Sequence, residues 1–226
     1  MLIRKQKTWG SRLLMAMALV SVASVGLAFT EDDTKEPKGD AWPLNTCVVS
    51  GGELGSMGDP IVFNHEGREV RFCCKGCIGK FKKDPDKYLK TADAEIIKQQ
   101  LPHYPFVTCI VMDDEPLGSE DMGEPVNRVY KNRLVRFCCK GCVRKFKKDP
   151  VAYIAKLDAA VIKKQMADYP MGYCVVAPDF KLDDDAVNYV FANRLVRLGS
   201  KECIKKFNEN PSAYLAKIDV AADKKD

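Results

Sequence analysis

The stretch VRFCCKGC at residues 70–77 occurs a second time without change at residues 135–142. Its first three residues alternate apolar and charged side chains, and the residues that follow predict a turn from a strand into a helix that begins near Cys74. Cys73 and Cys77 are four residues apart, so their thiols can face the same point one helical turn apart. The N-terminal dipole of such a helix favours thiolates. This stretch therefore predicts either a soft-metal site or a reactive dithiol.

The stretch belongs to a longer unit that is repeated three times. Each copy has an aromatic-Pro pair, a cysteine four residues after the proline, a Val-Arg-Phe or Val-Arg-Leu strand, another cysteine, a phenylalanine, Asp-Pro or Asn-Pro, and a tyrosine. The first cysteines of the copies are Cys47, Cys109 and Cys174, which follow one another at nearly equal spacing. We therefore predict three tandem modules, residues 42–103, 104–168 and 169–226, each too small for a large core.

Each module is predicted to be a β-hairpin followed by short helices, which gives an α+β fold. Gly67, Asn132 and Asn193 stand between the two strand patterns, and glycine and asparagine share a tolerance of positive φ, so the hairpin turns are placed there. Asp84-Pro85 is expected to end one helix and begin the next, because aspartate is a good N-cap and proline fits the first helical position.

The N-terminal residues carry a separate pattern. Four basic residues, the last of them Arg12, precede an apolar run from Leu13 to Phe29. This pattern is typical of a secretory signal peptide, residues 1–28, with a small-residue cleavage site at its end. The alternative is an uncleaved membrane anchor, for which this run is short. We therefore expect an exported protein, periplasmic or extracellular, without a membrane attachment after cleavage.

The charge of the chain lies mostly in this leader. The chain has 36 basic and 31 acidic residues, and removal of residues 1–28 leaves 32 against 31. A nearly neutral mature chain gives no reason to expect a nucleic-acid partner. Residues 29–41 are polar and charged and are predicted to be a disordered linker.

The cysteines combine into two sets of three. An exported chain with ten cysteines first suggests disulfides, but vicinal cysteines such as Cys73 and Cys74 rarely bond to each other. A distant cysteine joins each repeated pair, and this is the layout of a small zinc knuckle, in which metal replaces a core that the module is too small to form. The predicted ligands are Cys47, Cys73 and Cys77 in the first module, and Cys109, Cys138 and Cys142 in the second.

The cysteine spacing, the phenylalanine four residues after the last cysteine and the P-x-x-Y ending resemble the YHS and TRASH domains, which are small treble-clef-like modules associated with heavy-metal handling. The resemblance covers all three modules and is partial in the third. It implies that the same six cysteines bind metal. It also marks two departures, because Cys74 and Cys139 stand where the family often has serine, and the third module has Gly199 and Ser200 in place of a cysteine pair.

These departures lead to further expectations. Cys74 and Cys139 could be additional ligands, resolving thiols or merely small residues at a helix start, and their divergence of roughly 100° from the preceding residue predicts that they point away from the ion.

His65 could be a fourth ligand, but its counterparts are Tyr130 and Phe191, which favours a packing role. Met57 and Met122 could offer soft sulfur, although a buried loop methionine is commoner.

The third module keeps only Cys174 and Cys203. These occupy the positions whose sulfurs are expected to converge in the other modules, and the leader predicts an oxidising compartment. We therefore predict a Cys174–Cys203 disulfide. If metal supplies the missing core, its removal should unfold the first two modules and affect the third less.

The cysteine pattern favours an exported protein that binds zinc or copper(I) in modules 1 and 2, for metal storage, sensing or detoxification. A protein partner is not indicated. The alternative is a repeat protein without metal, stapled by disulfides or active in thiol exchange, that serves a structural or partner-binding role. No enzyme is predicted, because there is no Ser-His-Asp set, no phosphate-binding glycine loop and no repeated pairing of carboxylates.

Overall fold

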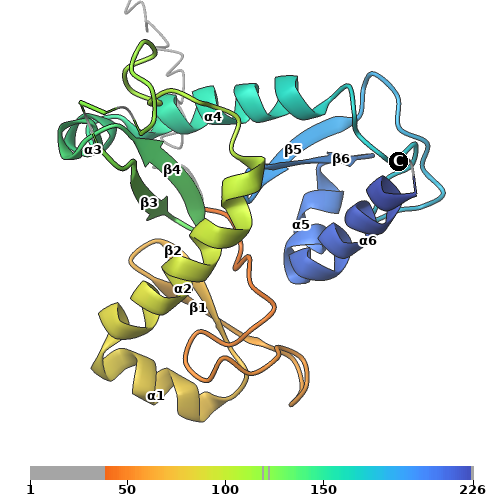
Figure 1. Cartoon of the computed structure of the whole chain (residues 1–226). Coiled ribbons are helices and arrows are strands. Elements are labelled where there is room, and N and C mark those ends of the chain that lie inside the picture. The colour runs from red at the N-terminus through yellow and green to blue at the C-terminus, as the bar shows by residue number, and fades with distance from the viewer. Residues whose placement is uncertain (1–38, 119, 122, 225–226) are drawn as a thin grey trace, which may run out of the picture. The chain divides into compact units, whose positions relative to one another are not determined.

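The computed structural model describes residues 39–118, 120, 121 and 123–224, and each repeat of the sequence is one hairpin with two following helices (Figure 1). This confirms the α+β class and the predicted order of elements. The first module contains β1 (Ile61–His65), β2 (Arg68–Phe72), α1 (Lys75–Lys83) and α2 (Pro85–Gln100). A short 3-10 helix, η1 (Leu101–His103), precedes the second module, with β3 (Val126–Tyr130), β4 (Arg133–Phe137), α3 (Lys140–Phe146) and α4 (Pro150–Gln165). The third contains β5 (Val187–Phe191), β6 (Arg194–Leu198), α5 (Glu202–Glu209) and α6 (Pro211–Asp223).

The predicted leader and the linker up to residue 38 lie outside the described residues. Within the described part of the chain, no helix combines the length and the apolar composition that crossing a membrane requires.

The three hairpins close with the same two-residue turn. The strands of each pair are antiparallel, and the turn residues have positive φ, as in a type I′ turn. The values are 50° and 77° for Glu66 and Gly67, 46° and 71° for Lys131 and Asn132, and 50° and 60° for Ala192 and Asn193. The prediction that placed the turns at Gly67, Asn132 and Asn193 is therefore confirmed.

The second helix of each module begins as predicted. The side chains of Asp84, Asp149 and Asn210 accept a hydrogen bond from the backbone N–H three residues later, and a proline occupies the first helical turn in each case. The donor–acceptor distances are 3.2, 3.1 and 3.3 Å. These caps satisfy N–H groups that a helix leaves unpaired at its start, and so they fix where α2, α4 and α6 begin.

The second helix of one module also covers the hairpin of the next. The buried Gln100, at the end of α2, donates to the carbonyl of Asn132 and accepts from the N–H of Leu134 at 2.8 Å each. Gln165, at the end of α4, repeats both bonds with Asn193 and Leu195, at 2.9 and 2.8 Å. Each of these glutamines therefore ties one module to the turn of the following one.

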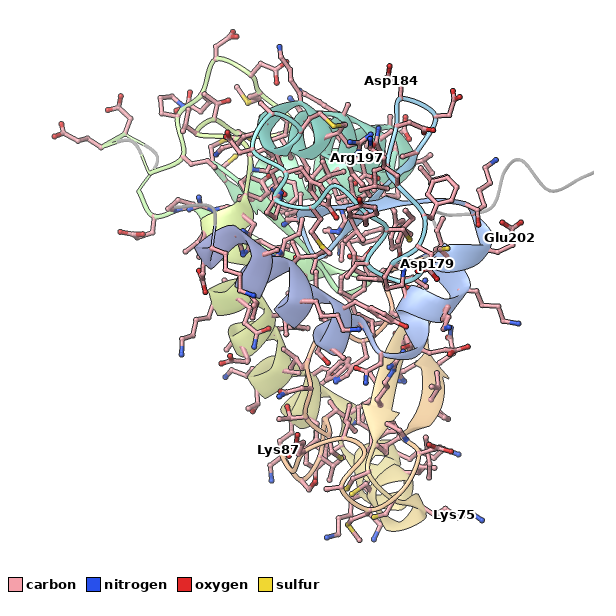
Figure 2. All side chains as sticks on the ribbon, turned by 90° about the vertical axis from the view of Figure 1, so that its right-hand side faces the viewer. Lys75, Lys87, Asp179, Asp184, Arg197 and Glu202 are labelled. Atoms are coloured by element: carbon pink, nitrogen blue, oxygen red, sulfur yellow. The ribbon has the colours of Figure 1, made fainter. Side chains whose placement is uncertain are left out.

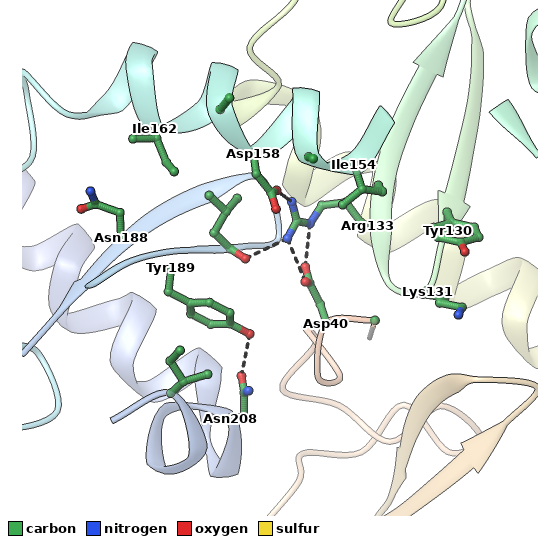
Figure 3. A pocket seen from close by; sticks show the side chains of 15 residues that line it. Asp40, Tyr130, Lys131, Arg133, Ile154, Asp158, Ile162, Asn188, Tyr189 and Asn208 are labelled. Atoms are coloured by element: carbon green, nitrogen blue, oxygen red, sulfur yellow. Dashed lines mark hydrogen bonds and ion pairs between the residues drawn. The ribbon is translucent and has the colours of Figure 1, made fainter. Parts of the chain in front are cut away.

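A buried carboxylate near the N-terminus of the described chain joins the second and third modules. Asp40 accepts two hydrogen bonds from the guanidinium of Arg133, at 2.7 and 2.8 Å (Figure 3). It also accepts one from the N–H of Ala192 at 2.7 Å. Arg133 also contacts Asp158 on α4 at 2.7 Å. Burial lowers the pKa of Arg133, but the two carboxylates outweigh burial and raise it above its usual range.

The predicted linker therefore ends too late. Residues 29–41 were expected to be disordered from their polar composition, but Asp40 and Ala41 are buried. Composition misplaces this boundary because the charge of Asp40 is neutralised by Arg133, which belongs to a distant part of the chain.

A repeated ion pair joins each hairpin to the second helix of its own module. The arginine that begins β2, β4 or β6 contacts an aspartate on α2, α4 or α6, and the pairs are Arg68–Asp93, Arg133–Asp158 and Arg194–Asp219. The first two have N–O distances of 2.7 Å. Packing of the helix on the hairpin brings these distant positions together, and the same ion pair fixes the second helix of each module to its own hairpin.

Candidate metal centres

The first cysteine cluster is assembled from a loop, a strand end and a helix start. Cys47 lies in a turn held by hydrogen bonds from its N–H to the carbonyl of Gly52 and from the N–H of Gly51 to its own carbonyl, at 2.8 and 2.9 Å. Cys73 directly follows β2, and Cys77 lies in the first turn of α1. The three sulfurs lie within 4.8 Å of one another, and those of Cys73 and Cys77 are 3.8 Å apart.

The second cluster repeats this geometry more deeply in the protein. Cys109, Cys138 and Cys142 are each at most 1% exposed, and their sulfurs also lie within 4.8 Å of one another. The distance between the sulfurs of Cys138 and Cys142 is 3.6 Å. The two sets of converging cysteines are the two that the sequence predicts.

The first cysteine of each cluster is the one most favoured as a thiolate. Burial raises the pKa of Cys47, but hydrogen bonds from the hydroxyl and N–H of Ser50 and from the N–H groups of Cys73 and Val49 lower it to about 7. Burial also raises the pKa of Cys109, and backbone N–H groups, that of Cys138 foremost, outweigh it in the same way. Backbone N–H groups that converge on a sulfur stabilise its charged form.

The pKa values of Cys77, Cys138 and Cys142 are shifted in the opposite direction. Burial raises the pKa of Cys77 to about 12 and that of Cys138 to about 11, and it raises the pKa of Cys142 as well. Hydrogen bonds from neighbouring cysteines and the charge of the first cysteine add to the shift at Cys77 and Cys142. Each cluster therefore has a first cysteine whose hydrogen bonds favour the thiolate, whereas a thiolate at Cys77, Cys138 or Cys142 is favoured only by a positive charge beside it.

Cys74 and Cys139 contact the clusters, which corrects the expectation that they point away. The sulfur of Cys74 lies 3.6 Å from that of Cys77, and the sulfur of Cys139 lies 3.9 Å from that of Cys142. The expected divergence assumed that both adjacent residues are helical, but Cys74 and Cys139 are N-cap residues with extended backbone, at φ −159° and −153°. An N-cap side chain turns back toward the third residue of its helix, which here is the last cysteine of the cluster.

These two thiols stand beside the groups of three rather than within them, since neither Cys74 nor Cys139 belongs to the sets whose sulfurs all lie within 4.8 Å. Hydrogen bonds from N–H groups at the helix start, that of Cys77 foremost, lower the pKa of Cys74, and the N–H of Cys142 leads the same effect at Cys139. Each cluster thus has an adjacent fourth thiol at a helix N-terminus, where a thiolate is favoured.

His65 packs on an aromatic ring. Its ring centroid lies 5.2 Å from that of Phe81 at an interplanar angle of 88°. Its counterparts Tyr130 and Phe191 meet Phe146 and Phe207 at the same centroid distance, 5.2 Å, with angles of 84° and 73°. The packing role favoured by the sequence comparison of the modules is therefore the one that the structure contains, and His65 is not part of the described cysteine groups.

Met57 is 72% exposed, so the expectation of a buried loop methionine is wrong at this position. Met57 lies between two glycines of positive φ, Gly55 at 94° and Gly58 at 103°. Met122 lies outside the described residues.

The third module has filled the place of its missing cysteine. A Cβ atom on Gly199, the counterpart of Cys73, would lie 2.6 Å from the ring of Phe180. No side chain fits there unless the ring moves, so the third module has an aromatic ring where the other modules have a cysteine side chain. The sequence analysis missed this role of Phe180, because no local pattern connects it to Gly199.

The remaining two cysteines of the third module still face each other. The sulfurs of Cys174 and Cys203 are free thiols 3.9 Å apart. Their proximity agrees with the expected convergence, and the disulfide itself stays a prediction. Peptide mass spectrometry of the non-reduced protein would detect the Cys174–Cys203 link.

A comparison with known proteins found no matching protein family, no matching curated protein and no matching solved structure. The function of the clusters therefore has to be argued from their own geometry and chemistry.

The three-thiol clusters fit a small soft cation. A tetrahedral zinc ion with Zn–S bonds of about 2.3 Å separates its sulfurs by roughly 3.8 Å. The sulfur–sulfur distances of the Cys73–Cys77 and Cys138–Cys142 pairs, 3.8 and 3.6 Å, are close to this value. Thiolates select Zn(II) and Cu(I) over Mg²⁺ and Ca²⁺, which prefer oxygen ligands. A three-thiolate set leaves one tetrahedral position for a further ligand.

Proposed function

We propose that this protein is an exported metal-binding protein that holds one Zn(II) or Cu(I) ion in each of its first two modules, for storage, sensing or detoxification. The observation that carries the proposal is the convergence of three sulfurs in the same geometry at two separate places of the chain. The metal is cargo of the protein, and no catalytic reaction is part of the proposal.

The third module supports the proposal by contrast. It keeps the hairpin, the two helices and the facing pair Cys174 and Cys203, but its third ligand position is Gly199, against which a phenylalanine ring packs. If these cysteines served only for packing, the third module would have no reason to replace both the cysteine sulfur and the space around it. Ligand loss and ring insertion in one module agree with ligand function in the other two.

Export and family membership are further parts of the proposal. The basic residues followed by an apolar run at residues 13–29 support a cleaved signal peptide and a periplasmic or extracellular location. The cysteine spacing supports kinship with the YHS and TRASH domains. Mass spectrometry of the mature N-terminus tests the export: a chain that begins near residue 29 is expected, and retention of residues 1–28 would refute cleavage.

A thiol-exchange or disulfide protein is the second candidate, and the short distances between cysteines favour it. The sulfurs of Cys74 and Cys77 are 3.6 Å apart, and those of Cys174 and Cys203 are 3.9 Å apart. In this function the thiols of modules 1 and 2 would be oxidised in pairs, and no metal would be held.

Metal content and free thiols, measured on the same sample, separate the two functions. The protein is purified from its native compartment without chelator, and its metal is quantified by mass spectrometry together with thiols before and after chelation. We expect about two equivalents of metal, in line with two three-thiolate sites, and thiols that become reactive on chelation. A sample without metal and without free thiols would refute metal binding and favour the disulfide protein.

Site-directed variants assign each equivalent of bound metal to one of the two cysteine clusters. Cys77→Ser is expected to remove one equivalent, Cys142→Ser the other, and both substitutions together all bound metal. Cys203→Ser is the matched control, because Cys203 is the equivalent residue of the module that lacks a three-thiol group. Loss of metal in the control as large as in Cys77→Ser would contradict the assignment.

A further inference from the structure

The two cysteine clusters differ in their access to solvent. In the first, Cys73 is partly exposed, and its sulfur lies 3.4 Å from the hydroxyl of the exposed Ser50. Its counterpart in the second cluster, Cys138, is 1% exposed. The same three ligand positions are thus open at one edge in module 1 and enclosed in module 2.

A groove borders the loop that carries the first cysteine of the first cluster. It has a volume of about 820 Å³, and Cys47 and Ser50 line one side while Tyr88, Thr91 and other residues of α2 line the opposite side. Lys87, in the first turn of α2, also lines the groove and appears in Figure 2 on the part of the protein formed by β1, β2, α1 and α2. The groove therefore opens beside the loop that carries Cys47 and Ser50, and the hydroxyl of Ser50 contacts the sulfur of Cys73 at the exposed edge of the cluster.

In the second module, a lysine connects the corresponding loop and helix. Lys156 on α4 donates to the carbonyl of Ile110 at 3.0 Å, and Ile110 directly follows Cys109. The same ammonium pairs with Asp113 and lies 5.9 Å from the centre of the Phe106 ring. We call this set of contacts the lysine strap. It ties the cysteine loop of module 2 to the helix that packs beside it.

The first module lacks both ends of the lysine strap. Thr91 stands at the position of Lys156, counted from the proline that begins each helix, and Gly51 stands at the position of Asp113, counted from the first cysteine. The hydroxyl of Thr91 donates to the carbonyl of Lys87 on its own helix, at 3.5 Å, and Thr91 is exposed. The loop and the helix of module 1 therefore lack this bridge.

The packing around the second cluster is also more extensive across modules than the packing around the first, in agreement with its lower exposure to solvent. Buried residues of the core around the second cluster include Val190 and Leu195 from the third module, and Ile97 of α2 packs against it. The buried residues of the core around the first cluster all come from module 1. A partly buried residue of module 2, Val129, packs against the first core. Opening of the second cluster therefore disturbs fully buried packing between modules, whereas the fully buried residues around the first cluster lie within one module.

We propose that the first cluster is the exchange site of the protein, where metal is taken from and given to a low-molecular-weight thiol, and that the second cluster retains its metal. This inference rests on the proposed function. In the exchange step the incoming thiol loses its proton to solvent, and its sulfur bonds to the metal as the bond to the Cys73 sulfur breaks. Cys73 then takes a proton from solvent, and the oxidation state of the metal is unchanged.

Release kinetics test the proposal. Protein loaded with two equivalents of Zn(II) is mixed with an excess of the chromogenic chelator 4-(2-pyridylazo)resorcinol, with and without reduced glutathione. We expect two phases of one equivalent each, with rates that differ by roughly tenfold or more, which corresponds to a barrier difference of about 1.4 kcal/mol. Glutathione should accelerate mainly the fast phase. Cys73→Ser should abolish the fast phase and Cys138→Ser the slow one.

Exchanging the lysine strap tests its part in the difference. Lys156→Thr is expected to bring the rate of the slow phase toward that of the fast phase, and Thr91→Lys to slow the fast phase. Lys163→Thr is the matched control on the same helix, because Lys163 is exposed, and it should leave both phases unchanged. Equal effects of Lys156→Thr and Lys163→Thr would overturn the role of the strap.

Alkylation gives a readout that needs no variant. Zinc-loaded protein is treated with N-ethylmaleimide for increasing times, and peptide mass spectrometry follows each cysteine. Cys73 is expected to react before Cys138. Two equivalents released in one phase, or reaction of Cys138 first, would refute the exchange site and leave metal binding intact. A failure to bind two equivalents would instead refute the proposed function, and the inference with it.

Discussion

At the scale of single residues, two equivalent asparagines make different numbers of contacts. Asn132 and Asn193 occupy the same turn position, both are buried, and both have positive φ, at 71° and 60°. The side chain of Asn132 donates to the carbonyls of Asp40 and Glu69, at 3.0 and 2.9 Å, and accepts from Arg68 at 2.6 Å. That of Asn193 donates to the carbonyl of Leu134, and its oxygen has no partner among the described residues.

Replacement of these asparagines by glycine should therefore have unequal effects. Glycine tolerates the positive φ of either turn, so the substitution removes the side-chain bonds without straining the backbone. We expect Asn132→Gly to lower the free energy of unfolding by about 3 kcal/mol, because it leaves buried polar partners unpaired, and Asn193→Gly by about 1 kcal/mol. Urea denaturation measures both. Each variant is the control for the other. Equal losses of unfolding free energy would contradict the explanation by side-chain hydrogen bonds.

At the scale of elements, the helices of each module begin in two different ways. α2, α4 and α6 begin with a capping carboxylate or amide followed by proline, whereas α1 and α3 have Cys74 and Cys139 at the N-cap. In α1 and α3 the residues of the first turn include a predicted metal ligand, Cys77 or Cys142. The second helix of each module is therefore capped by an aspartate or asparagine side chain. The helices that carry a predicted ligand have a cysteine at the N-cap.

Loss of the cap of α4 gives a prediction at this scale. Asp149→Ala removes the bond to the N–H of Ala152 and is expected to destabilise the protein by about 1 kcal/mol, the usual cost of an N-cap. Asp149→Asn should change the stability by only a few tenths of a kcal/mol, because asparagine caps equally well. Thermal or urea denaturation provides the measurement. Asp179→Ala, in an exposed turn, is the control, and a loss there as large as in Asp149→Ala would argue against the cap as the cause.

At the scale of the described molecule, buried contacts join all three modules. Asp40 holds Arg133 of the second module and Ala192 of the third, and Gln165 bridges the same two modules. The first module contacts the third through Arg71, which donates to the carbonyls of Asn208 and Glu209 at the end of α5. A guanidinium at a helix C-terminus satisfies carbonyls that the helix leaves unpaired.

These contacts change what chelation is expected to do. From the sequence alone, metal removal should unfold the first two modules and affect the third less, but the shared core and the buried contacts couple the third module to them. We therefore expect chelator to lower the midpoint of one cooperative transition, with a loss of about 4 kcal/mol per site when free metal had been a thousandfold above its dissociation constant. Circular dichroism with the thiols kept reduced measures this transition.

The control for this experiment is the double variant Cys77→Ser with Cys142→Ser. Its midpoint should not respond to chelator, since it lacks a ligand in each cluster. Two well-separated transitions in the native protein, with the later one insensitive to chelator, would restore the independent behaviour that the sequence suggests.

The sequence by itself determined several features of the protein, because they follow from short-range chemistry. The hairpin turns follow from the residues that tolerate positive φ, and the helix starts follow from Asp-Pro and Asn-Pro. The two sets of converging cysteines follow from the spacing of Cys73 and Cys77 and from its repetition. Each of these features depends on residues within about one turn of one another, or on a comparison of the three copies, so no knowledge of packing is needed.

Only the tertiary structure decided how the modules meet. The partner of Asp40, the ring of Phe180 against Gly199 and the lysine strap at Lys156 join positions whose proximity depends on which buried surfaces pack together. The repeated Arg68–Asp93 type of pair could have been found by aligning the modules, because its spacing along the chain is the same in each. Cys74 and Cys139 were misplaced because an N-cap residue has extended backbone, which the spacing alone does not reveal. The sequence therefore determines the candidate ligands, and packing determines how accessible each set of them is.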